Sequence, residues 1–235
     1  PPRRLTCFPS GCSVLYMKGY KRVVDLMSEA AARSGRDVSE IALVVVSKGR
    51  SVDQILEVYE AGHRDFGENR AGEMAEKVPE LPGNIRWHYV GNLQSRKARL
   101  VRGSTHVLHS LDRISLARAW VKGKGNPPPA LAQVNIGREE QKGGADPDTT
   151  AQLIGEILSL GIDVRGLMAI PPLGDEPEDS RRYFSSLRRL RDELVADGLV
   201  LPELSMGMTN DFEVAIEEGA SIIRVGRAIF DRTLA

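Results

Sequence analysis

Short apolar runs alternate with amphipathic segments along the chain, from residue 41 to its end. A run rich in Val and Ile and bounded by polar residues or Gly is typical of a buried strand, whereas apolar positions three or four residues apart are typical of a helix. By this pattern we expect strands at 41–49, 63–67, 85–90, 107–110, 130–136, 164–170, 204–208 and 222–225. The helices that we expect between and after them span 51–62, 68–77, 93–101, 114–122, 148–160, 179–196, 211–218 and 228–234.

Eight strands that alternate with eight helices predict an α/β fold, a single (β/α)8 TIM barrel. A doubly wound open sheet is the alternative, although it normally uses fewer repeats in a chain of 235 residues. One further amphipathic helix, from Lys18 to Arg33, precedes the first strand. Pro127–Pro129 stands directly before a predicted strand, so we interpret it as a stiff loop and not as a domain linker. We therefore expect one domain, residues 17–235, and a peripheral tail, residues 1–16.

Composition narrows the setting in which the protein works. Its 32 basic and 32 acidic residues cancel, so no overall attraction to nucleic acid or to an anionic membrane is implied. No apolar run approaches the roughly 18 residues that a membrane-spanning helix needs. Both cysteines, Cys7 and Cys12, stand in the expected tail, so we expect neither a disulfide framework nor a metal cluster. These features favour a cytoplasmic protein, and the lack of an exposed apolar stripe in the sequence pattern favours a monomer.

The first predicted strand, Ile41 to Gly49, ends in a lysine, Lys48. The carboxyl ends of the strands are the face on which barrel proteins carry their chemistry. An amine that is buried there has a lowered pKa and becomes a nucleophile toward carbonyl groups. A lone lysine more often reaches solvent or pairs with a carboxylate, so Lys48 becomes a candidate only in combination with other groups.

The loops after the seventh and eighth strands are the usual phosphate-binding loops of such barrels. Here they are residues 205–210 and 224–227. Gly207 and Gly226 let the backbone approach an anion closely, and the hydroxyls of Ser205 and Thr209 can bond to it. A phosphate site opposite a lysine predicts a phosphorylated carbonyl compound held as a Schiff base. Both pyridoxal 5′-phosphate (PLP) and an aldolase-type sugar phosphate satisfy this description.

Arg224 favours PLP over a sugar phosphate. It stands near the end of the eighth strand, from which its guanidinium can face a pyridine nitrogen. A donor that is permanently charged would keep that nitrogen unprotonated. The alternative is an ion pair between Arg224 and a carboxylate on a neighbouring strand.

A series of motifs in the expected order gives the chain a family resemblance over residues 41–230. The motifs are Val46-Ser-Lys48, Phe66-Gly-Glu-Asn69, Trp87-His-Tyr-Val-Gly-Asn-Leu-Gln94, Lys97, Val134-Asn135, Glu139, Lys142, Gly166-Leu-Met168, Leu204-Ser-Met-Gly-Met208, Asp211 and Val225-Gly226 after Arg224. With these motifs the chain resembles the YggS/PROSC family, the PLP homeostasis or PLP-binding proteins. That family has the barrel of alanine racemase without the second domain of that enzyme.

The resemblance implies a site for PLP at the mouth of the barrel. In that site Lys48 forms the Schiff base and Arg224 faces the pyridine nitrogen. The implied phosphate contacts are Ser205, Gly207 and Gly226, and the implied pocket residues are Asn69 and Met168, with Met206 and Met208 nearby. Ser47 and His88 stand in matching motifs and are possible pocket residues, although His88 fits a packed core position equally well.

Three positions depart from the pattern that we expect of the family. Gly49 stands where a Thr commonly follows the lysine, and Arg70 stands where an aromatic residue commonly follows the Phe-Gly-Glu-Asn motif. Arg227 replaces a small hydroxyl residue, but its guanidinium is a bidentate partner for phosphate. We therefore expect phosphate binding to survive, with Arg227 among the residues that bind PLP.

The resemblance implies a protein that binds PLP and buffers or delivers it, which affects vitamin B6 and amino-acid balance; its recipients would be PLP-requiring apo-enzymes. A PLP-dependent racemase of the alanine racemase type is the alternative, and a barrel enzyme with a Schiff-base lysine but no PLP is a third. Alanine racemases take a second base from a tyrosine of their extra domain, for which the sequence leaves no room after the eighth helix. An arginine at the ring nitrogen also weakens PLP as an electron sink. We therefore expect a carrier and not an enzyme, with at most weak racemase activity.

Overall fold

The computed structural model describes residues 13–139 and 141–231 of the chain. The predictions about Cys7, Cys12 and the first twelve residues lie outside this part of the chain. No helix within it is both long enough and apolar enough to cross a membrane.

Parallel strands form a closed barrel in which each strand pairs with the next and the last pairs with the first. In chain order they are β1 (Ala42–Val46), β2 (Asp65–Glu68), β3 (Arg86–Tyr89), β4 (Thr105–Leu111), β5 (Ala130–Gln133), β6 (Val164–Met168), β7 (Glu203–Ser205) and β8 (Ile222–Val225). The ring closes where Val44 of β1 lies opposite Arg224 of β8. This closure confirms the predicted barrel and excludes the open sheet.

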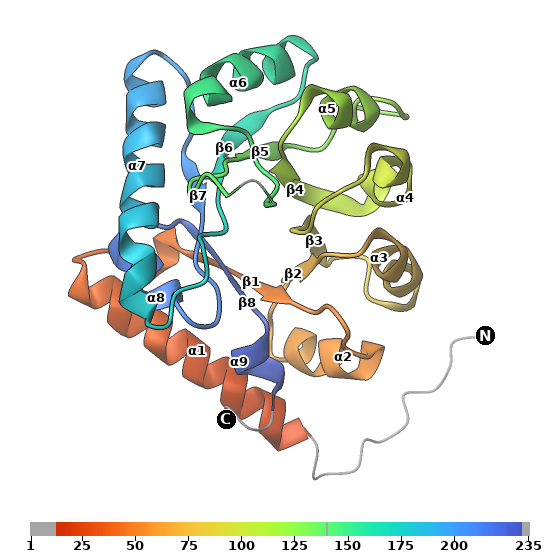
Figure 1. Cartoon of the computed structure of the whole chain (residues 1–235). Coiled ribbons are helices and arrows are strands. Elements are labelled where there is room, and N and C mark those ends of the chain that lie inside the picture. The colour runs from red at the N-terminus through yellow and green to blue at the C-terminus, as the bar shows by residue number, and fades with distance from the viewer. Residues whose placement is uncertain (1–12, 140, 232–235) are drawn as a thin grey trace.

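Helices surround the barrel on its outer side (Figure 1). They are α1 (Ser13–Arg33), α2 (Val52–Glu60), α3 (Ala71–Lys77), α4 (Ala98–Val101), α5 (Ile114–Trp120), α6 (Thr150–Ser159), α7 (Arg181–Ala196), α8 (Phe212–Glu217) and α9 (Arg227–Phe230). Ser51 begins α2 with a capping box, in which its hydroxyl accepts from the amide of Gln54 while the Gln54 side chain accepts from the amide of Ser51. This cap confirms the predicted start of that helix.

Helix α1 packs against α9, α8 and α2, over the seam where β1 and β8 meet (Figure 1). It begins at Ser13, five residues before the expected helix start at Lys18, and the boundary between tail and domain stays a prediction. Tyr16 is buried against Phe230, with 6.0 Å between the ring centroids. Gly19 is needed at the crossing with α9, because a Cβ there would lie 2.5 Å from the carbonyl oxygen of Ile229.

The core has two layers. A large outer cluster fills the space between strands and helices, and its largest fully buried side chains include Trp120, Phe66 and Phe184. A small cluster fills the inside of the barrel, and we call it the interior cluster: Val44, Val90, Val107, Leu131, Met168 and Ile222, with Val46 and Ile170 packed against it. Because side chains alternate along a strand, membership of either cluster tells which way each neighbouring side chain points.

Candidate functional site

Lys48 lies in the turn that follows β1, at the carboxyl mouth of the barrel. Val44 and Val46 point inward with the interior cluster, and Lys48 continues the same alternation toward the mouth. Its side chain is exposed, so the prediction of a buried amine at the strand end is wrong. Gly49 follows with a φ of +69°, a left-handed conformation that favours glycine and lets the chain leave the sheet here. The amine of Lys48 makes no hydrogen bond or ion pair with any other described residue, and it is therefore free to react.

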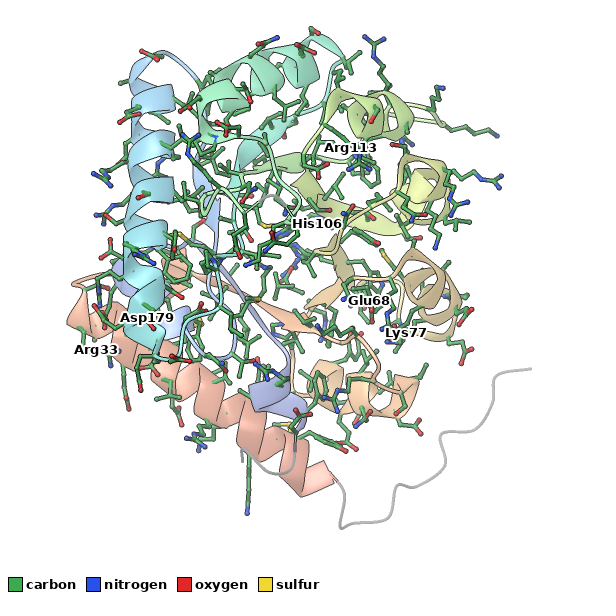
Figure 2. The ribbon with its side chains drawn as sticks, viewed as in Figure 1. Arg33, Glu68, Lys77, His106, Arg113 and Asp179 are labelled. Atoms are coloured by element: carbon green, nitrogen blue, oxygen red, sulfur yellow. The ribbon has the colours of Figure 1, made fainter. Side chains whose placement is uncertain are left out.

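A buried charge cluster lies beneath this turn, between β2 and α3 (Figure 2). The amine of Lys77 donates to the carbonyl of Ser47 at 2.8 Å and to Oε1 of Glu68 at 2.7 Å. The hydroxyl of Ser47 donates to the same Glu68 oxygen at 2.8 Å. Ser47 is fully buried and faces away from the barrel interior, so the structure does not support its predicted place in the pocket.

Glu73 of α3 completes the cluster. Its Oε1 accepts from the amine of Lys77 at 2.6 Å and from the backbone N–H of Gly49 at 2.5 Å. The carbonyl before Lys48 and the N–H after it are therefore both bonded to α3, while the side chain of Lys48 stays free. Burial raises the pKa of Glu68 and outweighs its bonds to Lys77 and Ser47, which lower it. We call Lys77, Glu68 and Glu73 the turn clamp.

Arg224 points into the barrel from β8 and is 3% exposed. Its Nη1 donates to Oγ of Ser205 at 2.6 Å, and its Nη2 donates to the carbonyl of Ala169 at 3.0 Å. Burial lowers the pKa of Arg224 to about 10, which leaves it a cation at neutral pH. No carboxylate of the described chain forms an ion pair with it, so the alternative reading of a strand-to-strand ion pair is wrong. Two of its five N–H donors are used, and three remain for a ligand.

Ser205 and Met206 are both fully buried. The hydroxyl of Ser205 lies below the mouth and is bonded to Arg224 and to Nδ1 of His109, so it supports Arg224, and its predicted phosphate contact stays a prediction. Met206 is fully buried in the outer cluster and faces away from the interior. The reason is depth and alternation: β7 ends at Ser205, and consecutive side chains point to opposite sides of the sheet.

The two expected phosphate loops do meet at the rim of the mouth. Nη2 of the exposed Arg227 donates to Oδ1 of Asn210 at 3.3 Å, which joins the loop after β8 to the loop after β7. Oδ1 of Asp211 accepts from the backbone N–H of Met208 at 2.7 Å and fixes the shape of the loop after β7. Thr209, in the loop after β7, is half-buried.

Both loop glycines are required by packing. A Cβ on Gly226 would lie 2.7 Å from the carbonyl oxygen of Val46, so its absence lets β8 approach β1. Gly207 has a φ of +92°, and a Cβ there would lie 2.6 Å from that of Ala215. These contacts explain both glycines without a ligand, and their predicted phosphate contacts stay a prediction.

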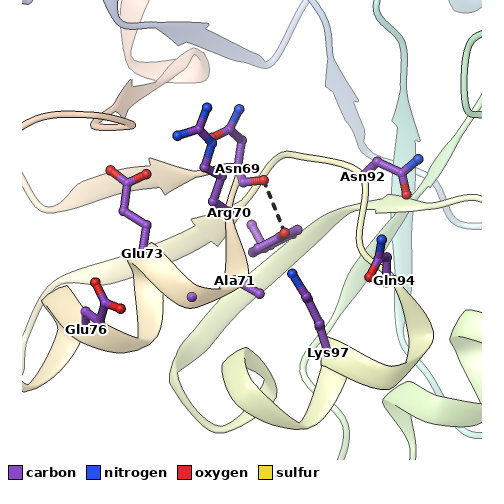
Figure 3. Close-up of a pocket in the computed structure, with 10 residues that line it drawn as sticks. Asn69, Arg70, Ala71, Glu73, Glu76, Asn92, Gln94 and Lys97 are labelled. Carbon is purple, nitrogen blue, oxygen red and sulfur yellow. Dashed lines mark hydrogen bonds between the residues drawn. The ribbon is translucent and has the colours of Figure 1, made fainter.

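Two cavities flank the mouth. One of about 590 Å³ opens between α3 and the segment after β3, where Lys97 points into it opposite Asn69 and Arg70 (Figure 3). Oδ1 of Asn69 is buried there and has no hydrogen-bond partner among the described residues. The second cavity, of about 420 Å³, is lined by Met208 and Lys142 among others. Met168 lies below both, fully buried in the interior cluster, where it can form part of a floor.

His88 also lies below the mouth, inside the barrel. Its Nδ1 is 2.8 Å from Nε2 of His109, and its Nε2 is 3.1 Å from Oδ1 of Asp65. It lines a cavity of about 350 Å³ on the opposite, amino-terminal side of the barrel together with His106. His88 is therefore a core residue with one polar partner on each side, and it does not line the mouth.

Comparison with known proteins decides the family. The alanine racemase N-terminal domain model matches residues 26–232. A pyridoxal phosphate homeostasis protein of Aquifex aeolicus is 42% identical over 215 residues, which cover 89% of this chain and 94% of the relative. The chain belongs to the pyridoxal phosphate homeostasis protein family. This membership confirms the resemblance that the motifs gave.

Solved structures of similar chains agree with the family and the barrel. PipY of Synechococcus elongatus, solved with PLP bound, is 33% identical, covers 87% of this chain and 99% of its own, and has a TM-score of 0.74. A protein from Bifidobacterium adolescentis is also 33% identical, covers 96% of this chain and 98% of its own, and has a TM-score of 0.88. The likeness therefore spans almost the whole barrel.

The residues of this chain fit the ligand of that family. At the mouth stands a lysine amine without a partner among the described residues, and below it a buried arginine that uses two of its five donors on them. The guanidinium of Arg227 at the rim suits a phosphate, and the orphaned Oδ1 of Asn69 offers an acceptor to a ligand hydroxyl or N–H group. The sequence analysis did not predict the charge cluster under Lys48. One feature of the sequence could have indicated it: Glu73 and Lys77 stand four residues apart, on one face of a helix.

Proposed function

We propose that this protein binds PLP, holds it as a Schiff base on Lys48, and buffers or delivers it, which affects vitamin B6 and amino-acid balance. The observation that carries the proposal is the free amine of Lys48 on an α3-anchored turn, on the inward-pointing side of β1 next to the strand of Arg224. Membership of the family and the PLP in the related PipY support it.

Each group at the mouth has a role in this proposal. Lys48 supplies the nucleophilic amine, and the turn clamp fixes its backbone so that only the side chain moves. Arg224 presents N–H donors to the pyridine nitrogen, and Arg227 and Thr209 bind the phosphate at the rim, together with the backbone at Gly207 and Gly226. The bound ligand supplies an electrophilic aldehyde, and its ring, left unprotonated by Arg224, is a weak electron sink. Asn69, Met168 and Met208 complete the walls.

Lys48→Ala tests the assignment directly. We expect complete loss of covalent PLP and of its visible absorption band, with an unchanged free energy of unfolding, because the replaced side chain is exposed and makes no hydrogen bond or ion pair with a described residue. The measurement is an absorption spectrum after incubation with PLP, then borohydride reduction and peptide mass mapping. Lys122→Ala, which removes another exposed lysine, is the matched control and should retain the band. An adduct that persists in Lys48→Ala, or that spreads over surface lysines of the wild type, contradicts the proposal.

A carrier role is favoured over racemisation by Arg224. The cation next to the ring disfavours a protonated pyridine and therefore a stabilised carbanion. The family model is nevertheless that of a racemase domain. Racemisation assays with several amino acids at high protein concentration separate the two: we expect at most a weak rate, and a rapid Lys48-dependent rate would make the protein an enzyme.

We further propose that the protein acts as a cytoplasmic monomer that hands PLP to apo-enzymes. Transfer is measured by mixing the loaded protein with a PLP-requiring apo-enzyme and following the activity of that enzyme. A rate of activation above that given by the same amount of free PLP supports delivery, whereas a lower rate supports buffering. Light scattering gives the mass in solution.

A further inference from the structure

A chain of buried polar side chains crosses the inside of the barrel from Arg224 to Asp65. Nη1 of Arg224 bonds to Oγ of Ser205 at 2.6 Å, and this hydroxyl lies 2.8 Å from Nδ1 of His109. Nε2 of His109 lies 2.8 Å from Nδ1 of His88, whose Nε2 lies 3.1 Å from Oδ1 of Asp65. Ser205 and His109 are fully buried, and His88 is 5% exposed. At the far end Arg86 pairs with Asp65 through Nε at 2.7 Å.

The Arg224 end of this chain of hydrogen bonds determines which atoms of Ser205 and His109 donate and which accept. A guanidinium has donors and no acceptor, so Ser205 must accept from Arg224. The hydroxyl of Ser205 has one proton left, and His109 is its only acceptor among the described residues. A buried hydroxyl proton without an acceptor would cost about 1–3 kcal/mol. Ser205 therefore donates to His109, and Nδ1 of His109 carries no proton.

The Asp65 end agrees with this direction. Burial raises the pKa of Asp65, but the hydrogen bonds from His88 and Arg86 outweigh it and hold that pKa well below its usual range, so Asp65 is an acceptor. His88 must then donate from Nε2. Nδ1 of His109 carries no proton, so its Nε2 does and donates to Nδ1 of His88. Both imidazoles are therefore neutral with the proton on Nε2. A second proton on His109 would set two donors against each other.

We propose that Ser205, His109, His88 and Asp65 are positioning residues for Arg224, linked in a one-way chain in which every hydrogen bond is donated away from the guanidinium. The chain connects the buried cation to a carboxylate that it does not touch, and bonds aligned in one direction strengthen one another. It holds Nη1 on the β7 side, while the carbonyl of Ala169 holds Nη2, so the remaining donors of Arg224 keep one place. This inference rests on the proposed PLP site, because it assigns these residues a part in presenting Arg224 to the ring nitrogen.

The proton positions are tested in the ligand-free protein, so the result does not depend on PLP. Nitrogen NMR of ¹⁵N-histidine protein near neutral pH should show both His88 and His109 neutral with the proton on Nε2. Their signals are assigned with His88→Gln and His109→Gln. In Ser205→Ala, Nδ1 of His109 loses the hydroxyl that donates to it, so we expect its nitrogen signal to move, while His88, still bonded to Asp65, keeps its proton on Nε2. A proton on Nδ1 of either ring in the wild type, or an unmoved Nδ1 signal of His109 in Ser205→Ala, overturns the chain.

The link to Arg224 is tested by titrating the full-length protein with PLP. We expect Ser205→Ala and His109→Leu to weaken PLP binding about tenfold, the scale of one lost buried hydrogen bond, and to move the absorption maximum. Ser205→Thr keeps the hydroxyl and should restore both properties. His106→Leu is the matched control, because its exposed ring lies 5.7 Å from that of His88 but outside the chain.

Unchanged affinity and spectrum in Ser205→Ala would mean that Arg224 needs no support and would overturn the positioning role. If His109→Leu does not fold, Ser205→Ala and its Ser205→Thr rescue still decide. An adduct away from Lys48 would instead defeat the proposed function and leave the NMR result standing.

Discussion

Single residues at this barrel mouth divide into those held by the protein and those left for a ligand. Lys48 is left free although its neighbours on both sides are bonded to α3. Arg224 is held by two of its donors and is left with three. A residue can therefore be fixed in place and still be available for binding, because the groups that hold it are not the groups that react.

Asp65 provides a prediction about pH. Its pKa is lower in the folded protein than in the unfolded chain, so it stabilises the fold at a pH above its unfolded value of about 4 and loses this effect as the pH falls toward its folded value. We expect Asp65→Asn to be less stable than the wild type near neutral pH, and the difference to shrink as the pH drops below about 4. Urea unfolding across the acid range measures this.

Asp163→Asn is the control for this experiment, since it removes an exposed carboxylate that pairs with Arg165 on the surface. Its difference from the wild type should be small at every pH. A constant deficit in Asp65→Asn over the whole acid range would mean that lost packing, and not ionisation, is responsible.

Sequence reasoning found Lys48 and Arg224 because a charge inside or directly after an apolar run stands out. It could not find Asp65 or His109, whose polar character is ordinary at the edges of such runs. It could not show that Ser205 is fully buried below the mouth, because the pattern gives neither the depth of a residue in the barrel nor the point at which the strand ends. Partners distant in the chain, such as His109 and Ser205, become neighbours only through the closed sheet.

At the scale of elements, the predicted strands were correct in number and order, but β1, β3, β5, β6 and β7 were predicted too long at their carboxyl ends. The apolar runs through Ile136, Ile170 and Met208 continue after β5, β6 and β7 have ended. Ile170 still packs against the interior cluster and Ile136 against the outer cluster, so their apolar character reflects burial in loops at the mouth and not strand geometry. Hydrophobicity alone does not distinguish these two kinds of burial.

The turn clamp gives a prediction about α3. In Lys77→Met the fully buried carboxylate of Glu68 loses its counter-ion, and we expect a loss of about 3–5 kcal/mol in the free energy of unfolding. The backbone next to Lys48 also loses the bond from Lys77 to the carbonyl of Ser47, so the covalent reaction with PLP should slow. Denaturant unfolding and the growth of the visible band measure the two effects.

The double variant Lys77→Met with Glu68→Gln should recover much of the lost stability, because no unpaired charge stays buried. Lys21→Met, at an exposed position of α1, is the control and should change the free energy of unfolding by less than about 0.5 kcal/mol. A Lys77→Met protein as stable as the wild type would show that the clamp contributes nothing to the fold.

At the scale of the whole molecule, α1 covers the seam of the barrel and depends on one close crossing. Gly19→Ala places a methyl group 2.5 Å from the carbonyl oxygen of Ile229 and 2.8 Å from that of Ala228. Both neighbours are backbone atoms of α9 and have little room to move. We expect a loss of about 1–3 kcal/mol in the free energy of unfolding, measured by denaturation.

Gly155→Ala is the matched control for Gly19→Ala. Gly155 also lies within a helix, α6, but a Cβ there has open space around it. The same substitution should therefore stabilise the protein by about 0.5–1 kcal/mol through helix propensity. Equal effects at both positions would show that α1 does not pack tightly on α9.

The pairing of β1 with β8 also sets a condition on synthesis. Lys48 follows the first strand to leave the ribosome and Arg224 lies on the last, yet the two strands are neighbours in the finished barrel. Contacts between such distant segments form late, because the intervening loop must first close. A nascent chain can therefore expose the reactive lysine well before the arginine that completes the site has been synthesised. Only the finished barrel brings the two groups together and can bind the ligand firmly.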